Sequence, residues 1–149
     1  FKRLVIGKRV RLRGGLVIEA ESCEKDDSGT VICVYARCVT TAPGEDPEDG
    51  VKPKGVIHWV SANHAVPATV RRYDRLFAVP DPAKAENFSD VLNANSLTTN
   101  TSAMIEPGLI AAEPEAVFQF EREGYFVADR HEHCSARPVF NMTIGLRDT

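Results

Sequence analysis

Residues 16–40 read LVIEAESCEKDDSGTVICVYARCVT, and this stretch decides the fold class. Its two ends, residues 16–25 and 31–40, are rich in apolar and β-branched residues, and the turn residues DDSGT lie between them. Two such runs on either side of a turn that contains Gly predict a β-hairpin. We therefore expect an all-β protein in which this hairpin forms part of a larger sheet.

Further short runs with strand character lie on both sides of the hairpin. Arg alternates with Val and Leu over residues 9–13, which is the period-two pattern of a strand with one apolar and one charged face. More strands are expected within residues 55–61, 68–77, 96–105, 117–123, 124–129 and 138–148. Helical spacing is confined to residues 83–92. This series predicts an antiparallel sandwich or barrel with one short helix.

Two segments organise the chain between these strands. Residues 41–54 combine Pro, Gly and acidic residues without a hydrophobic period, which is typical of an exposed loop. The composition changes near VPDP, residues 79–82, where we expect a boundary between subdomains. The aromatic residues expected in the core are Trp59, Phe118, Phe120, Tyr125, Phe126 and Phe140.

The composition places the chain among globular proteins. It has 149 residues, of which 43% are hydrophobic and 26% charged, with a formal net charge of -3. No stretch approaches the eighteen or so apolar residues of a membrane span, so no membrane partner is expected. The four cysteines form no CxxC pair, which favours reduced, mostly buried thiols and a cytoplasmic location. Because the chain starts at Phe1 rather than Met, we expect a piece of a longer protein.

A basic strand stands out in this acidic chain. Residues 2–15 read KRLVIGKRVRLRGG, in which six of fourteen residues are Lys or Arg and none is acidic. Arg9, Arg11 and Arg13 would share one strand face, where they repel one another unless an anion lies beside them. A solvated face is one interpretation, and a nucleic-acid phosphate is the other. Possible further contacts to RNA are Arg71, Arg72, Arg75, Gln119 and Arg122.

A metal or catalytic site is less favoured by the sequence. His131, His133 and Cys134 could supply three ligands to zinc, but no fourth ligand is evident and the spacing matches no zinc-finger pattern. A polar loop is the favoured interpretation. The sequence also lacks a nucleophile elbow, a Gly-rich phosphate loop and a pair of carboxylates suited to acid and base catalysis. It therefore predicts binding rather than catalysis.

Three stretches of the chain resemble a known family. They are KGVIHWVSANHAVPATVRRYDRLFAVPDP (54–82), FQFEREGYFVAD (118–129) and RPVFNMTIGLRDT (137–149). Together they resemble the carboxy-terminal part of the bacterial glutaminyl-tRNA synthetases, which are class I aminoacyl-tRNA synthetases, and the resemblance runs over essentially the whole chain. In that family this region is the anticodon-binding part and consists of two consecutive β-barrels. The resemblance implies a complete or nearly complete distal barrel over residues 1–79 and the last part of a proximal barrel over residues 80–149.

The resemblance also implies a function. The parent enzyme recognises the CUG and UUG anticodons of glutamine tRNA and attaches glutamine with ATP and magnesium. Its ATP-binding motifs do not occur in this chain, so the resemblance implies no cofactor here and no ligase activity by this chain alone. The implied partners are glutamine tRNA and the enzyme's own catalytic domain, within a cytoplasmic monomer. A generic barrel that binds single-stranded RNA without base preference is the alternative.

The resemblance assigns contacts with RNA to seven residues, namely Lys2, Arg3, Lys8, Arg11, Arg13, Gln119 and Arg122. Arg3 resembles the arginine that reads the last anticodon base, a guanine. Arg11 and Arg13 resemble residues around the first base and its phosphate, and the two lysines resemble electrostatic helpers. Gln119 and Arg122 resemble contacts to the central uracil. In an ideal strand these two side chains point to opposite faces, so a shared base requires a bend near EREG, residues 121–124.

Overall fold

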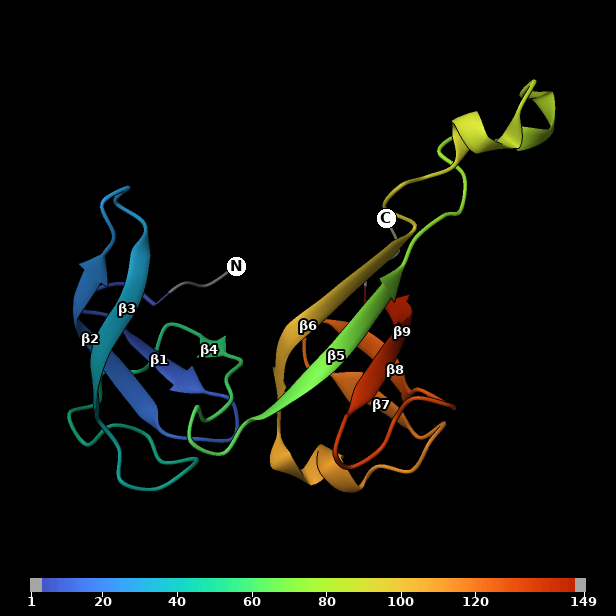
Figure 1. The fold of residues 1–149 in the computed structure, drawn as a ribbon. Coiled ribbons are helices and arrows are strands. Elements are labelled where there is room, and N and C mark those ends of the chain that lie inside the picture. The colour runs from blue at the N-terminus through green and yellow to red at the C-terminus, as the bar shows by residue number, and fades with distance from the viewer. Residues whose placement is uncertain (1–3, 147–149) are drawn as a thin grey trace. The chain divides into compact units, whose positions relative to one another are not determined.

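The structure is a computed structural model that describes residues 4–146. The chain divides into two compact units, Phe1–Trp59 and Val60–Thr149. Figure 1 shows the strands of both units, and each unit is described below by itself. The described residues contain strands and short 3-10 helices but no α-helix, which confirms the all-β prediction.

The first unit is a sheet of four strands, in the order β3-β2-β1-β4. Its strands are β1 (Arg9–Leu12), β2 (Val17–Lys25), β3 (Val31–Cys38) and β4 (Val56–Ile57). The antiparallel hairpin of β2 and β3 confirms the prediction from residues 16–40. The turn closes because the Asp26 carboxylate accepts hydrogen bonds from the backbone of Ser28 and Thr30. The small core of this unit contains Val10, Val17 and Ala20.

The second unit is a sheet of five strands, in the order β6-β5-β9-β8-β7. Its strands are β5 (Val66–Tyr73), β6 (Leu97–Ile105), β7 (Val117–Phe120), β8 (Gly124–Ala128) and β9 (Val139–Gly145). The core consists of inward side chains from alternate positions, among them Phe126 and Phe140, with Phe118 and Phe120 packed against them. These four aromatic residues confirm the prediction of an aromatic core, whereas Tyr125 is 41% exposed.

Two features of the sheets differ from the prediction of antiparallel barrels. Both sheets are mixed, because β1 pairs in parallel with β4 and β5 pairs in parallel with β9. Among residues 4–146, the outer strands of each sheet do not pair with each other, so neither sheet closes into a barrel. Strand alternation reveals the faces of a strand but not the direction of its neighbour, which is why the parallel pairs were not predicted.

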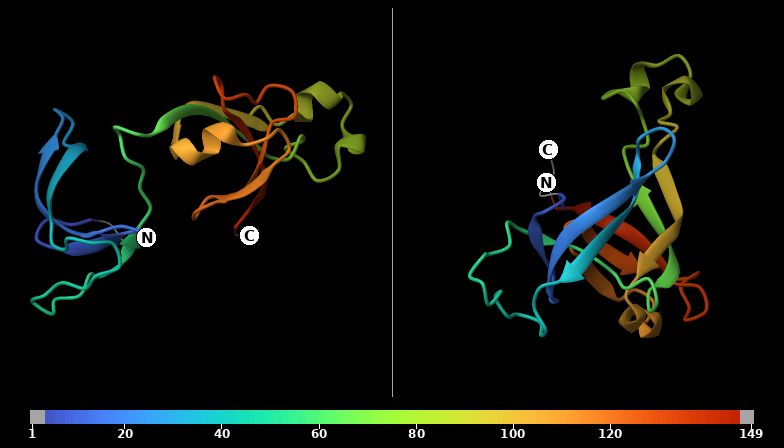
Figure 2. Two further views of the ribbon diagram at one scale, coloured as in Figure 1. Left: turned by 90° about the horizontal axis from the view of Figure 1, so that it is seen from below. Right: turned by 90° about the vertical axis from the view of Figure 1, so that its left-hand side faces the viewer.

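The predicted short helix at residues 83–92 is wrong in detail. Two 3-10 helices, η1 (Pro82–Lys84) and η2 (Phe88–Val91), lie there, and a third, η3 (Pro107–Ala111), follows β6. Ala85 adopts an extended conformation directly after η1, and the Asn87 side chain caps η2 by accepting a hydrogen bond from the Ser89 amide. The segment between β5 and β6 that carries η1 and η2 extends beyond the ends of these strands (Figures 1 and 2).

The boundary between the units lies between Trp59 and Val60, whereas the sequence placed it near Val79. The reason is the pairing of β5, which hydrogen-bonds to β6 and to β9 and so belongs to the second sheet. All four cysteines are free, as predicted, but the expectation that they are mostly buried is wrong, since Cys23 and Cys33 are partly exposed and Cys38 and Cys134 are exposed. Within residues 4–146, none of the helices is both long enough and apolar enough to cross a membrane.

Candidate nucleic-acid interface

The basic strand β1 lies beside the loop formed by residues 41–54. We call this segment the acidic loop. Val10 is buried in the core at 3% exposure, so its neighbours Arg9 and Arg11 extend from the opposite face of the strand. Both guanidinium groups contact carboxylates of the acidic loop. The repulsion expected between the strand arginines is therefore reduced by this chain's own acidic residues.

Arg9 is held by three carboxylate contacts. Its Nε donates to Glu19 Oε2 at 2.6 Å, and its two terminal nitrogens donate to the two carboxylate oxygens of Asp49 at 2.7 and 2.6 Å. One of these nitrogens also reaches the Val51 carbonyl at 3.3 Å. Two-point contact between a guanidinium and a carboxylate is among the stronger ion-pair geometries. Arg9 thus ties the acidic loop to the strand.

This ion pair changes the acidity of its carboxylates. The hydrogen bonds from Arg9 lower the pKa of Asp49 to about 2. Arg9 also lowers the pKa of Glu19, and the two carboxylates raise the pKa of Arg9 itself. Both acids are therefore ionised at neutral pH and remain so under mildly acidic conditions.

Arg11 is bound much less completely than Arg9. One terminal nitrogen, NH2, donates to Asp46 Oδ1 at 2.7 Å. The other, NH1, is buried and has no hydrogen-bond partner. The Arg11 side chain is 19% exposed, and the Asp46 side chain is 62% exposed. Arg11 therefore keeps an unused donor beside an accessible carboxylate.

Arg13 follows β1 and lies at the turn that leads to β2. Its carbonyl accepts a hydrogen bond from the Trp59 indole at 3.0 Å, and its amide donates to the Ile57 carbonyl at 2.9 Å. Trp59 also packs near Gly15, where an added Cβ would lie 3.3 Å from the indole ring. Trp59 is 42% exposed, so the prediction that it is buried in the core is wrong for this chain. Its indole nevertheless fixes the backbone at Arg13.

The remaining basic residues of this stretch are placed only in part. Lys8 is exposed directly before β1, and its carbonyl accepts a hydrogen bond from the Ala20 amide. Lys2 and Arg3 lie outside the described residues.

The hairpin of β7 and β8 carries the other two residues that the resemblance assigned to RNA. Gln119 is exposed on β7, opposite Tyr125 of β8. The strands are joined through residues 121–123, and Arg122 has a φ of 65°, so the chain reverses at EREG. Gly124 follows this turn, and its lack of a side chain lets β9 lie close to β8, because an added Cβ would lie only 2.6 Å from the Ile144 carbonyl oxygen.

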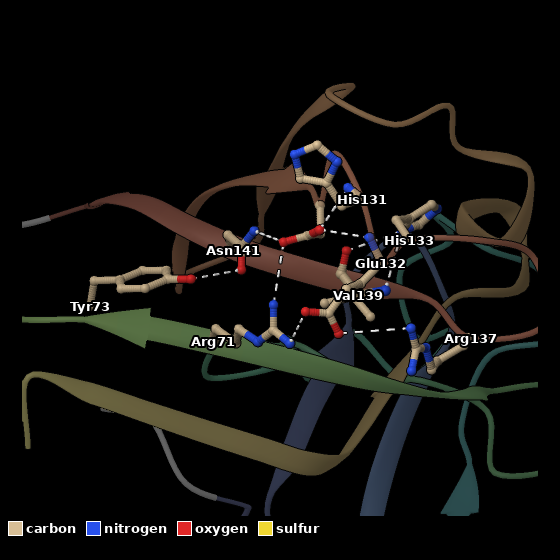
Figure 3. Close-up of polar contacts among 9 residues, drawn as sticks. Arg71, Tyr73, His131, Glu132, His133, Arg137, Val139 and Asn141 are labelled. Carbon is tan, nitrogen blue, oxygen red and sulfur yellow. Dashed lines mark hydrogen bonds and ion pairs between the residues drawn. The ribbon is translucent and has the colours of Figure 1, made fainter.

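Two arginines of β5 have partners within the second unit. Arg71 donates to Asp129 at 3.3 Å and to Glu132 at 2.9 Å. Figure 3 shows the guanidinium group of Arg71 beside Glu132. Arg72 forms an ion pair with Glu123 in the turn between β7 and β8. Arg71 is thus a structural residue that connects β5 to the segment after β8, and Arg72 connects β5 to the tip of the hairpin.

Asp129 is the centre of the contacts around Arg71. Its carboxylate accepts hydrogen bonds from the Asn141 amide group at 2.7 Å and from the backbone amides of His131 and Glu132 at 2.9 and 2.8 Å. These hydrogen bonds, led by that from Asn141, lower the pKa of Asp129 to about 2. Tyr73 donates to the same Asn141 side chain at 3.1 Å (Figure 3). Asp129 therefore fixes the loop between β8 and β9.

His133 belongs to the core rather than to a polar site. It is 6% exposed, its Nδ1 lies 3.1 Å from the Val139 carbonyl oxygen, and its ring meets the Phe140 ring edge to face at 5.0 Å. Cys134 and His131 are exposed. In the part of the chain that the structure describes, no three His, Cys, Asp or Glu side chains are grouped in a way that could hold a metal ion.

Sequence reasoning missed the role of Asp46 and Asp49. The signal that could have found them is charge complementarity, because the basic run RVRLR at residues 9–13 and the acidic run GEDPEDG at residues 44–50 have opposite charge. The sequence predicted an exposed loop for the second run, which is correct for its surface position. Its contact with β1 depends on residues 35 and 40 positions apart.

Comparison with known proteins identifies this arrangement. A family model described as the anticodon-binding domain of class I tRNA synthetases (E and Q) matches residues 56–129. The glutamine–tRNA ligase of Colwellia psychrerythraea is 53% identical over all 149 residues, and that of Serratia proteamaculans is 52% identical over the same length. The glutamine–tRNA ligase of Yersinia enterocolitica is 53% identical. The chain spans 27% of the length of each of these relatives.

The family match and the relatives agree with the resemblance seen in the sequence. Identity above half over the whole chain leaves no segment of these 149 residues without a counterpart in the relatives. The chain belongs to the class I tRNA synthetase family for glutamate and glutamine, as the carboxy-terminal anticodon-binding domain of a glutamine–tRNA ligase.

Proposed function

We propose that this chain binds the anticodon loop of glutamine tRNA and distinguishes the CUG and UUG anticodons from others. The identity of 53% with a glutamine–tRNA ligase across all 149 residues carries the proposal. Attachment of glutamine to the tRNA would require the remainder of the parent chain, because this chain spans 27% of that relative. The chain's contribution is recognition.

Seven residues are proposed to contact the RNA, namely Lys2, Arg3, Lys8, Arg11, Arg13, Gln119 and Arg122. The exposed side chains of Lys8, Arg13, Gln119 and Arg122 support this assignment, since each is accessible to a ligand. A guanidinium group can donate two hydrogen bonds to a phosphate or to a guanine edge, and a carboxamide can donate to and accept from a base edge. Arg3 would read the last base, and Gln119 with Arg122 the central base.

The proposal extends to the architecture of the parent. The first unit would be part of the distal anticodon-binding barrel and the second unit part of the proximal barrel, with the boundary between Trp59 and Val60. ATP and magnesium would bind to the remainder of the parent chain, since the described residues offer no cluster suited to a metal ion and the sequence has no ATP-binding motif. The parent would act as a cytoplasmic monomer whose catalytic domain contacts this region.

Titration with anticodon stem-loop RNAs tests the proposal. The 149-residue chain is titrated with stem-loops that carry CUG or UUG and with variants changed at the central or last base, each at two salt concentrations. Binding that weakens by about tenfold or more for a changed base is expected. Salt-sensitive binding that is equal for all anticodons would favour the generic single-stranded RNA-binding protein. No binding to any stem-loop would overturn the proposal for the chain.

A variant at Arg3 sharpens this test. Arg3→Ala should weaken binding to the CUG stem-loop by about 1–3 kcal/mol and relax the preference for the last base, because two-point contact with guanine is lost. An equal loss on every stem-loop would show instead that Arg3 contacts a phosphate. The matched control is Arg130→Ala, which removes a 69% exposed arginine from the loop after β8.

A further inference from the structure

We propose that the Asp46 carboxylate binds Arg11 in the RNA-free chain, in the place where an RNA phosphate would bind. RNA then displaces Asp46 from Arg11 on binding. This inference rests on the proposed function, because it concerns how one arginine of that surface is made available. According to this inference, the acidic residue Asp46 influences the affinity of the chain for RNA although Asp46 does not contact the RNA.

The difference between the two arginines of β1 is the first argument. Arg9 has three close carboxylate contacts and a fourth contact to a carbonyl, so any ligand would have to break a well-satisfied cluster. Arg11 has one carboxylate contact and an unmet donor at NH1. A buried donor without an acceptor is costly and rare in native proteins. Of these two guanidinium groups, Arg11 is the one that a ligand would satisfy better.

The ease with which Asp46 can leave is the second argument. Its side chain is 62% exposed, and its contact with Arg11 uses one carboxylate oxygen. The loop around it is held by other residues: Asp49 binds Arg9, and the Glu45 carboxylate accepts from the Ala42 amide at 2.9 Å. Rotation of the Asp46 side chain would therefore free Arg11 while the acidic loop keeps its attachment to β1.

Electrostatic repulsion opposes the binding of Asp46 and of an RNA phosphate to Arg11 at the same time. A phosphate on Arg11 would lie within a few ångströms of the Asp46 carboxylate, and like charges at that separation repel even in a solvent-screened site. A phosphate has several acceptor oxygens and can bind two guanidinium nitrogens at once. NH1 is buried and has no partner beside Asp46, so the Arg11 side chain would turn outward for a phosphate to bind both nitrogens. RNA and Asp46 therefore compete for one side chain.

The experiment compares two loop variants of equal charge. Asp46→Asn removes the competing carboxylate, and Glu48→Gln removes a negative charge from the same loop at an exposed residue without a contact to Arg11. Both are titrated with the CUG stem-loop in the 149-residue chain. We expect Asp46→Asn to bind about twofold to fivefold more tightly than Glu48→Gln, the range that one exposed ion pair allows. Both should bind more tightly than the unchanged chain.

Two further measurements make each outcome decisive. In the background of Arg11→Ala, Asp46→Asn should change the affinity for the stem-loop no more than Glu48→Gln does, because the guanidinium group for which Asp46 and RNA compete is absent. In the unchanged chain, the carboxyl carbon resonance of Asp46 should shift on addition of the stem-loop more than that of Glu48. Equal affinities of the two variants would overturn the proposal that RNA displaces Asp46 from Arg11. Weaker binding by Asp46→Asn than by Glu48→Gln would show instead that Asp46 orients Arg11 for RNA. Absence of binding by the unchanged chain would remove the proposed function and this inference together.

Discussion

Arg9 of β1 and Asp49 of the acidic loop face each other through two hydrogen bonds, of 2.7 and 2.6 Å, between both terminal guanidinium nitrogens and both carboxylate oxygens. They lie 40 positions apart in the sequence. This pair, together with the contact of Arg9 to Glu19, gives the first unit a charged attachment in addition to its small core of Val10, Val17 and Ala20.

The first unit should therefore lose stability in acid. The pKa of Asp49 is about 2 in the folded chain, below its ordinary value of 3.8. A carboxylate with a depressed pKa stabilises the fold above its ordinary pKa, and this contribution is lost as the pH falls through the folded value. We expect the urea midpoint of the first unit to fall between about pH 4 and pH 2. Fluorescence of Trp59 reports this unit, because it is the one tryptophan in the sequence.

Asp49→Asn should remove part of this pH dependence and lower the urea midpoint at neutral pH. The matched control is Asp27→Asn, which makes the same change in the exposed turn between β2 and β3. An equal acid response in the Asp49→Asn variant and the unchanged chain would show that the ion pair contributes nothing to folding.

Asp129→Asn should destabilise the second unit and leave the first unit unchanged. The Asp129 carboxylate accepts four hydrogen bonds, including one from Arg71, and its side chain is 15% exposed. Since hydrogen bonds to charged groups contribute about 1.5–3 kcal/mol, we expect a loss of that size in the free energy of unfolding. Circular dichroism in urea measures it, with Trp59 fluorescence as the readout of the first unit.

The control for Asp129 is Asp90→Asn, an exposed carboxylate of the same unit in η2. A loss no greater than that of the control would mean that the Asp129 contacts are not maintained in solution. Unfolding of the first unit at a lower urea concentration would contradict the expectation that this substitution affects the second unit alone.

Gly124→Ala should disrupt the hairpin that presents Gln119 and Arg122. The added Cβ would lie 2.6 Å from the Ile144 carbonyl oxygen and 2.9 Å from the Met142 methyl carbon. The oxygen belongs to the backbone of β9, so the strands must shift. A cost of about 1–3 kcal/mol is expected from such overpacking, measured by urea unfolding. Gly108→Ala is the control, because nothing lies within 4 Å of a Cβ there. Equal stability of the two variants would contradict the strand register.

Features of the fold that depend on residues close together in the sequence could be predicted, whereas features that depend on residues far apart could not. The hairpin of β2 and β3 was predicted because its signals are local: two apolar runs and a turn in which Asp26 binds the amides of Ser28 and Thr30. The parallel pairing of β1 with β4 could not be predicted, because β4 has two residues and neither strand pattern specifies its partner. The same reason explains why the expected boundary near Val79 differs from the division between Trp59 and Val60, which places β5 in the second unit.

The candidate site was predicted in the same uneven way. A bend was expected at EREG, and Arg122 has a positive φ there. That Gln119 and Arg122 share one base stays a prediction. The charged partners of Arg9 and Arg11 were not recognised, because Asp49 and Asp46 reach them across 40 and 35 positions of sequence. Trp59 was expected in a core because it lies in an apolar run with strand character, yet its indole serves as a hydrogen-bond donor to the Arg13 carbonyl and stays 42% exposed.

Gln119→Ala should reduce discrimination at the central anticodon base while leaving the fold intact. Gln119 is exposed on β7, where its carboxamide is available for both donor and acceptor contacts. Loss of one base-edge contact worth about 1–3 kcal/mol should weaken binding to the CUG stem-loop by about tenfold. Stem-loops changed at the central base should lose much less affinity. Thr98→Ala on β6 is the control, since it is an exposed polar residue on the outer strand of the same sheet. A loss that is equal for all central bases would show that Gln119 does not read the base.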